Sequence, residues 1–387
     1  MKVPLFDMTR QYEKLRKEIL KNLDAVFTSG RVILGDNVKM LEENVQKYLI
    51  TKHAIGVASG SDALLIAVKA LNFEKGDYII TTPYTFFATA SSITRNGLKP
   101  LFVDITEKDY DIDLGKVEDI LQNHPEKEKI KGFIPVHLFG KSMDLKRLKQ
   151  IKEKYGIKII EDNAQSIGAR EQIDGKEVYA GTVGDVGTIS FFPTKNLGGY
   201  GDGGMIITNN DDLAARMRKL RVHGAAKKYH HDEVGFNSRL DEVQAAILKI
   251  KLKELEKYIE KRIKKAENYA ELFKKHNLED KIKYPEVKTD KSHVYHQYVV
   301  ELKKGDRDRL KDFLKEKGIG TSIYYPVGLH SQECFKNLGY SEDDFPVTQH
   351  ATKTTLALPI FPELKKKEQE YVIENIKKYF EGEEKWN

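Results

Sequence analysis

The first two thirds of the chain alternate between short apolar segments and longer amphipathic ones. "YIITTP" at 78–83, "GFIPVHLFG" at 132–140 and "IKIIEDNA" at 157–164 have the length and composition of buried strands. Between the last two lies "MDLKRLKQIKEKYG", which has helical spacing and ends in a glycine. Strands that alternate with helices predict an α/β fold, with a mostly parallel central sheet flanked by helices.

The pattern changes near Leu240. Apolar residues then recur at helical spacings of three and four, at Leu240, Val243, Ile247 and Ile250. This apolar stripe fits a buried two-fold interface with a second copy of the chain. A charged segment from about 249 to 275 predicts one long helix, and an alternating strand at 293–302 and a helix at 307–318 follow. We therefore expect a large α/β domain over residues 1–250, which includes the N-terminal segment, and a smaller α+β domain over residues 251–387.

Charge and cysteine content narrow the partners. The 387 residues include 65 basic and 59 acidic ones, a net charge of +6 that is interspersed along the chain. No basic stripe suggests nucleic acid as a partner, whereas a mild positive excess suits an anionic small molecule. The single cysteine, Cys334, cannot form an internal disulfide, so we expect a reducing cytoplasm. No apolar segment is long enough to predict a membrane span or a signal peptide.

A lone lysine stands in "SFFPTKNLGGYGDGG", which runs from Ser190 to Gly204. A solvated loop lysine is the simpler interpretation of Lys195. However, an amine in a partly apolar pocket loses its charge more readily and can attack an aldehyde, and glycines allow the backbone to pass close to a ligand. A Schiff-base lysine is therefore the functional interpretation.

Two further segments supply groups that an aldehyde cofactor with a phosphate would need. Glu161 and Asp162 end a buried strand, where open α/β sheets bind ligands, and strand alternation sends their side chains to opposite faces. Gly60, Ser61 and Asp62 lie where a strand gives way to a helix, whose N-terminus favours a phosphate. The simpler alternative in both cases is helix N-capping, by Asp162 or Asn163 in the first segment and by Ser59 or Ser61 in the second.

These motifs together resemble the DegT-type nucleotide-sugar aminotransferases, which have the aspartate-aminotransferase fold and use pyridoxal phosphate. The resemblance covers nearly the whole chain. Its motifs, in family order, are "PLFDMTRQY", "SGRVILGDNV", "ASGSDAL", "PYTFFATA", "EDNAQSIGA", "SFFPTKNLGGYGDGG", "GFNSRLDEVQAAIL" and "YYPVGLHSQECF". Some relatives have histidine in place of Lys195 and remove a hydroxyl group, so the lysine here favours transamination.

The resemblance implies a role for each cofactor-binding residue. Lys195 would form the Schiff base, Asp162 would bind the pyridine nitrogen and Gln165 the ring hydroxyl. Phe86 would stack on the ring, although its neighbour Phe87 is easily confused with it and core packing is the alternative for both. The phosphate would be held by Gly60, Ser61, Asp62 and Ser190, and by Asn237 from the partner subunit of a homodimer with shared active sites.

The resemblance also implies the substrates. Tyr324, Tyr325 and His330 would face the sugar, and Arg31 and Arg239 the anionic diphosphate. The amino group would pass from L-glutamate to a nucleotide-linked keto sugar in amino-sugar or surface-polysaccharide biosynthesis. "FNSRLDEVQAAIL" favours amination at C3 of a 3-keto sugar, because C4 enzymes more often have methionine where Leu240 stands.

Three alternatives are weighed against this assignment. A C4 aminotransferase is the alternative within the enzyme class. A non-catalytic regulatory or binding protein with the same fold is the alternative outside it, but such a protein would be expected to lose Lys195 or Asp162. The loop at His230, His231 and Asp232 suggests metal ligation only weakly, because no further Cys or His cluster accompanies it. We therefore expect no metal.

Overall fold

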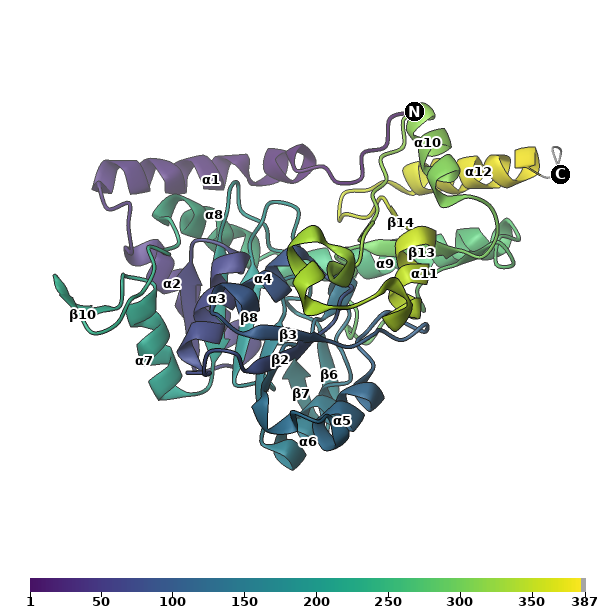
Figure 1. Ribbon diagram of the computed structural model, residues 1–387. Helices are drawn as coiled ribbons and strands as arrows, with labels where there is room; N and C mark the ends of the chain where they lie inside the picture. The colour runs from purple at the N-terminus through teal and green to yellow at the C-terminus, as the bar shows by residue number, and fades with distance from the viewer. Residues whose placement is uncertain (384–387) are drawn as a thin grey trace.

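A seven-stranded sheet forms the centre of the computed structural model, which describes residues 1–383 (Figure 1). Its strands, in spatial order, are β1 (His53–Val57), β9 (Gly204–Thr208), β8 (Val186–Ser190), β5 (Lys158–Asp162), β4 (Ile130–Phe133), β2 (Tyr78–Thr81) and β3 (Lys99–Phe102). Every neighbouring pair is parallel except the two that β9 makes. The predicted α/β fold with a mostly parallel sheet is confirmed.

Successive residues of the central strands bury their side chains on opposite faces of the sheet. On one face, Ile79 and Ile160 pack with α3 (Gly60–Ala70), α4 (Phe87–Arg95) and α7 (Asp211–Leu220). On the other, Ile80 and Ile159 pack with α5 (Leu114–Asn123) and α6 (Leu145–Tyr155). This alternation explains why apolar residues follow one another in the middle of these strands, as a sheet covered on both faces requires.

The helix predicted over residues 249–275 is two helices. α8 (Glu242–Leu252) ends before Lys253, and α9 (Leu255–Lys275) begins two residues later. α8 packs against α1 (Thr9–Ser29) and α2 (Asp36–Leu49), whereas α9 packs against α12 (Lys366–Glu383). The chain thus breaks where its packing partners change.

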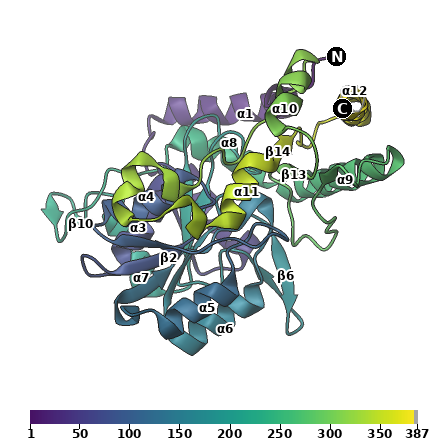
Figure 2. The same ribbon diagram turned by 45° about the vertical axis from the view of Figure 1, so that its right-hand side comes forward.

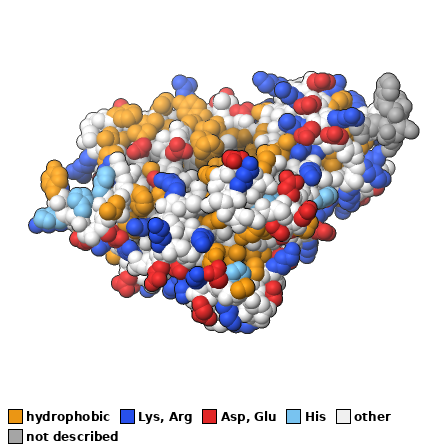
Figure 3. Space-filling model, in the orientation of Figure 1, with side chains coloured by type: hydrophobic (Ala, Val, Ile, Leu, Met, Phe, Trp, Pro, Cys, Tyr) orange, Lys and Arg blue, Asp and Glu red, His pale blue; other side chains and the backbone are white. Residues whose placement is uncertain are grey.

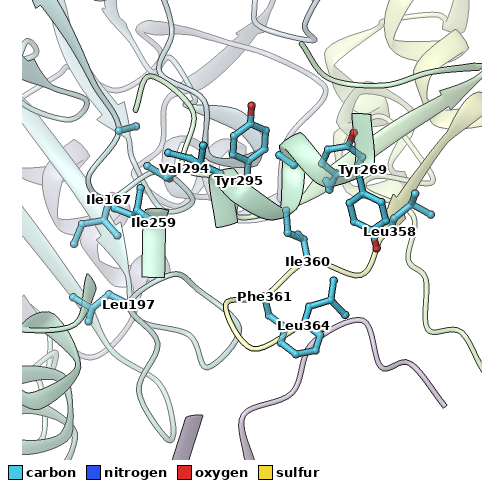
Figure 4. Packing of buried hydrophobic residues seen from close by; sticks show 14 of the residues in the cluster. Ile167, Leu197, Ile259, Tyr269, Val294, Tyr295, Leu358, Ile360, Phe361 and Leu364 are labelled. Atoms are coloured by element: carbon cyan, nitrogen blue, oxygen red, sulfur yellow. The ribbon is translucent and has the colours of Figure 1, made fainter. Parts of the chain in front are cut away.

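The C-terminal part contains a three-stranded antiparallel sheet of β12 (Ile282–Lys283), β13 (Tyr298–Leu302) and β14 (Thr355–Leu358). Its helices are α10 (Arg307–Glu316), α11 (Pro346–Thr354) and α12, and α12 lies near α9 in both ribbon views (Figure 2). Side chains of α9, β14 and the chain that follows β14 share a core with Leu197 of the lysine loop (Figure 4). This core ties the C-terminal part to the loop that carries Lys195.

The N-terminal residues run beside the C-terminal part. Val3 pairs with Ile319, and Arg10 forms an ion pair with Glu368 at 2.7 Å. The domain boundary near residue 251 stays a prediction, and the last four residues of the expected second domain lie outside the described range.

Two hairpins complete the fold. They are β6 (Arg170–Ile173) with β7 (Lys176–Tyr179), and β10 (Ala225–Lys227) with β11 (His230–His231). The second hairpin contains the histidine pair, where Asp232 forms an ion pair with Lys219 and His231 bonds to the His223 carbonyl. Among the helices of residues 1–383, none is long and apolar enough to cross a membrane.

Candidate active site

Asp162 is a buried carboxylate at the carboxyl end of β5. Its Oδ2 accepts a hydrogen bond from Thr89 Oγ1 at 2.8 Å, and its Oδ1 accepts one from the Ala164 backbone at 3.2 Å. Burial raises the pKa of Asp162, while the hydrogen bond from Thr89 and the positive charge of Lys195 oppose that rise. The carboxylate is thus held in a dry site where a cationic partner would bind strongly.

Glu161 points to the opposite face of β5, as strand alternation predicts. It accepts hydrogen bonds from His137 Nε2 at 2.8 Å and from the backbone N–H groups of Gly181, Val183 and Gly184. Burial raises its pKa, but the hydrogen bonds from His137 and from the Gly184 and Gly181 backbone outweigh that effect, so the pKa of Glu161 is lowered overall. Glu161 therefore secures the strand end, while Asp162 faces the site.

Lys195 lies on a tight turn after β8. Its backbone N–H donates to the Phe192 carbonyl at 2.9 Å, and Gly199 donates to the Phe191 carbonyl at 2.8 Å. A side chain at Gly198 would approach the Pro193 carbonyl to 2.3 Å, so glycine is required there. Burial lowers the pKa of Lys195 to about 8, against the opposing charge of Asp162. A neutral, nucleophilic amine is thus accessible near neutral pH.

Gly60 and Ser190 meet at the N-terminus of α3. A Cβ on Gly60 would lie 2.6 Å from the Ser190 Cβ, so only glycine allows β8 and α3 to approach this closely. The N-cap of α3 is Ser59, whose Oγ accepts from the Asp62 backbone at 3.1 Å. Ser61 is exposed and does not cap the helix. The structure therefore brings the predicted phosphate-binding residues together at one helix N-terminus.

The aromatic residues before α4 have different environments. Phe86 is 58% exposed, so core packing does not explain it. Phe87 packs against Phe335, with ring centroids 5.6 Å apart. Phe86 is therefore the freer ring, as a stacking role requires.

Gln165 lies three residues after Asp162 and makes two hydrogen bonds. Its Oε1 accepts from the Phe139 backbone at 2.8 Å, and its Nε2 donates to the Tyr325 hydroxyl at 3.1 Å. Tyr325 also lies close enough to Asp162 for that charge to raise its pKa. The structure thus joins Gln165, Asp162 and Tyr325, which are far apart in sequence.

The other predicted residues occupy three places. Asn237 and Arg239 line a hollow of about 590 Å³ together with Ser59 of the same chain. Arg31 is exposed, and its Nη1 lies 3.9 Å from Asp36 Oδ2. His330 is buried against the Phe345 ring, at 4.6 Å between centroids, and is close to Gln349. The backbone N–H of the neighbouring Leu329 donates a hydrogen bond to the carbonyl of Pro83, which lies in the loop that carries Phe86. The roles of these residues stay predictions.

The structure places three residues at the site that the sequence motifs did not predict, namely Thr89, His137 and Tyr84. Thr89 donates to Asp162, His137 to Glu161, and Tyr84 to the Tyr324 carbonyl at 2.6 Å. Thr89 and Tyr84 lie in the "PYTFFATA" motif, but no spacing in that motif indicates which residues face Asp162 or Tyr324. Only the packing of distant segments reveals these contacts.

The fold, with Lys195 near the buried Asp162, is that of the pyridoxal-phosphate-dependent aminotransferases. Residues 13–377 match the model of the DegT/DnrJ/EryC1/StrS aminotransferase family, and the chain belongs to that family. It is a pyridoxal-phosphate-dependent sugar aminotransferase. The resemblance noted from the sequence motifs is confirmed.

Similar proteins include enzymes and one protein named for regulation. The chain is 48% identical to a "Pleiotropic regulatory protein" of Geobacillus stearothermophilus, covering 98% of this chain and 99% of that one. It is 37% identical to a UDP-N-acetyl-3-dehydro-alpha-D-glucosamine 3-aminotransferase of Acidithiobacillus ferrooxidans, covering 98% of each. The Bacillus subtilis NtdA structure with bound cofactor PMP has a TM-score of 0.86 and 29% identity, covering 97% of this chain and 85% of that one.

The residues present fit this cofactor. A buried carboxylate suits a protonated ring nitrogen, an exposed ring at Phe86 suits stacking, and the corner of Gly60 and Ser190 at a helix N-terminus suits a phosphate. Lys195 would supply the amine for the aldehyde, and its pKa of about 8 leaves about a tenth of the amine neutral at pH 7. Asp162, Phe86, Ser190 and Lys195 would therefore hold pyridoxal phosphate.

Proposed function

We propose that this enzyme moves an amino group from L-glutamate to C3 of a nucleotide-diphosphate-linked 3-keto sugar, in amino-sugar or surface-polysaccharide biosynthesis. The observation that carries the proposal is the pair of Lys195 and Asp162, in a chain 37% identical over its length to a named sugar 3-aminotransferase. The retained pair also argues for catalysis rather than for a purely regulatory role of the kind that the Geobacillus protein's name indicates.

Lys195 and Asp162 divide the proton chemistry between them. Pyridoxal phosphate, when bound, supplies an aldehyde carbon and a ring that accepts electrons. The Lys195 amine would take up the proton that leaves the α carbon of the amino donor and would deliver it to the carbon that the cofactor's aldehyde supplies. The Asp162 carboxylate would hold a proton on the ring nitrogen, and Thr89 fixes the orientation of that carboxylate. Surrounding protein excludes water from the buried Asp162, which strengthens its electrostatic effect, whereas Lys195 is half-buried.

The site must accept two unlike substrates in turn, an amino acid and a sugar nucleotide. Both are anionic, and guanidinium groups suit carboxylate and phosphate alike. Arg239 lies in the hollow beside Ser59, and Arg31 is exposed on the segment after α1. We assign these two residues to the diphosphate of the sugar nucleotide.

The active unit is proposed to be a homodimer in which Asn237 reaches the phosphate in the neighbouring subunit. The apolar stripe on α8, an expected contact surface, is covered by α1 of the same chain through Ile19. That part of the expectation is wrong, because the stripe stabilises the subunit itself. Large apolar side chains are instead exposed on α1 and the segment after it, at Leu20, Phe27, Val32, Ile33 and Leu34.

Those exposed residues offer a surface for a second copy. Figure 3 shows hydrophobic side chains gathered along the edge of the molecule on which α1 lies. Apolar clusters of this kind mark contact sites in soluble proteins, and obligate dimers commonly bury more than ~2,000 Å². A dimer through this surface would enclose the cofactor and cover the exposed side chains at once.

Product analysis tests the proposed reaction. Purified protein loaded with pyridoxal phosphate is incubated with L-glutamate and a panel of 3-keto and 4-keto sugar nucleotides, and products are identified by mass spectrometry and NMR. We expect 2-oxoglutarate and a 3-amino sugar nucleotide, and no product with Lys195→Ala. A product aminated only at C4, or the same turnover with Lys195→Ala, would contradict the proposal.

A further inference from the structure

The backbone of Phe139 fixes the orientation of the Gln165 amide. Phe139 has φ of 58°, in the left-handed region that residues other than glycine seldom adopt. This conformation accompanies a hydrogen bond of 2.8 Å from its N–H to Gln165 Oε1. Because a backbone N–H can only donate, the amide oxygen must face Phe139 and the amide nitrogen must face away from it.

The direction of the next hydrogen bond follows from that orientation. Gln165 Nε2 lies 3.1 Å from the Tyr325 hydroxyl oxygen, and an amide nitrogen can only donate. The Tyr325 oxygen is therefore the acceptor, and its own hydrogen is left to donate elsewhere. Within residues 1–383 this hydroxyl has no other hydrogen-bond partner. The pair thus offers two hydrogens, one from Gln165 Nε2 and one from the Tyr325 hydroxyl.

Tyr325 is held in place by Tyr84. The two rings pack edge to face with centroids 6.0 Å apart, and the Tyr84 hydroxyl donates to the Tyr324 carbonyl at 2.6 Å. Burial raises the pKa of Tyr325, the hydrogen bond from Gln165 opposes that rise, and the charge of Asp162 adds to it. Tyr325 therefore keeps its proton throughout the working pH range.

We propose that Tyr325 and Gln165 donate hydrogen bonds to one anionic oxygen, the deprotonated ring hydroxyl of pyridoxal phosphate. Two converging donors favour an oxyanion, since each hydrogen bond to a charged oxygen is stronger than one to a neutral oxygen. Tyr325 is then a cofactor contact and not the sugar contact that the family resemblance implies. This inference rests on the proposed position of Gln165 at the ring hydroxyl.

Replacing Tyr325 with phenylalanine tests the inference without turnover. Removing the Tyr325 hydroxyl leaves the ring oxygen with one hydrogen-bond donor fewer, so more negative charge stays on that oxygen. This charge stabilises the proton on the nitrogen that joins Lys195 to the cofactor, and the pKa of that nitrogen rises. We expect the midpoint of the pH titration of the visible absorbance to rise in Tyr325→Phe holoenzyme. The expected rise is about one pH unit, a tenfold change in proton affinity.

Tyr110→Phe is the matched control. Tyr110 belongs to the same aromatic cluster, with its ring centroid 6.0 Å from that of Tyr84, but its hydroxyl donates to Glu301. Removing the Tyr110 hydroxyl should leave the midpoint of the pH titration within about 0.2 pH units of wild type, because that hydroxyl faces Glu301 and not the ring hydroxyl. Thermal melting of the apoproteins shows whether each variant folds.

A second variant covers the case in which Tyr325→Phe does not fold. Gln165→Glu keeps an acceptor for the Phe139 N–H but cannot donate, so the midpoint should again rise. If neither variant raises the midpoint, or if Tyr325→Phe keeps the wild-type midpoint and only raises KM for the sugar nucleotide, the inference is overturned. A wild-type protein that shows no visible band on adding pyridoxal phosphate would instead refute cofactor binding itself.

Discussion

Replacing Glu161 with glutamine should destabilise the protein strongly although the two side chains have the same shape. The carboxylate is fully buried. Its Oε1 accepts from Val183 at 2.7 Å and from Gly184 at 2.5 Å, and its Oε2 accepts from Gly181 and His137, both at 2.8 Å. The Nδ1 of His137 accepts from the Met143 backbone, so the proton of this ring lies on Nε2. All four groups around the carboxylate are therefore donors.

A glutamine amide offers only one acceptor atom to these four donors. In either orientation its NH₂ group faces two N–H donors, so two hydrogen bonds to a charged group are lost. Each contributes about 1.5–3 kcal/mol to the free energy of unfolding. A neutral amide costs less to bury than a carboxylate, which offsets part of the loss. We expect Glu161→Gln to lower the free energy of unfolding by about 3 kcal/mol.

Urea unfolding of the apoprotein at pH 8 and fixed protein concentration measures this change. Glu128→Gln is the control, since Glu128 is exposed, and its effect should stay within about 0.5 kcal/mol. The pKa of Glu161 is lowered from its ordinary value of 4.5, so its stabilising contribution is present above that pH and is lost as the pH falls through the folded-state pKa. The difference in the free energy of unfolding between wild type and Glu161→Gln should therefore become smaller at acidic pH. A variant as stable as the control at pH 8 would refute the reasoning.

Three further results are expected. The rate at which the apoprotein binds pyridoxal phosphate should rise with pH and level off above about pH 8, because only neutral Lys195 attacks the aldehyde. Stopped-flow absorbance measures this rate, and a rate that does not depend on pH would contradict the prediction. Asp162→Asn should lower kcat by more than it weakens cofactor binding, since an amide cannot hold the ring nitrogen in its protonated form; kcat equal to wild type would place another group at that nitrogen. Mixed dimers of inactive Lys195→Ala and Asn237→Trp subunits should regain part of the activity, because one of their two sites is intact; no recovery despite verified subunit exchange would show that Asn237 serves its own chain.

Local sequence pattern was enough to predict the elements around the sheet. The apolar runs ending at Thr81 and Asp162 and the turn at Gly60 depend on neighbours in the chain, because strand alternation and helix capping act over a few residues. The same local rules correctly sent Glu161 and Asp162 to opposite faces. They failed at Lys253, where the break between α8 and α9 depends on which neighbours each helix packs against.

The sequence by itself determined the family, the sheet and the residues expected to hold the cofactor, because those features are written in contiguous motifs. Tertiary structure alone decided what surrounds them. It placed Thr89 on Asp162, covered the stripe on α8 with α1, and set Tyr325 beside Gln165. The physical reason is that hydrogen-bond direction, burial and pKa depend on atoms brought together from distant segments, such as Tyr84 and Tyr324, which are 240 residues apart.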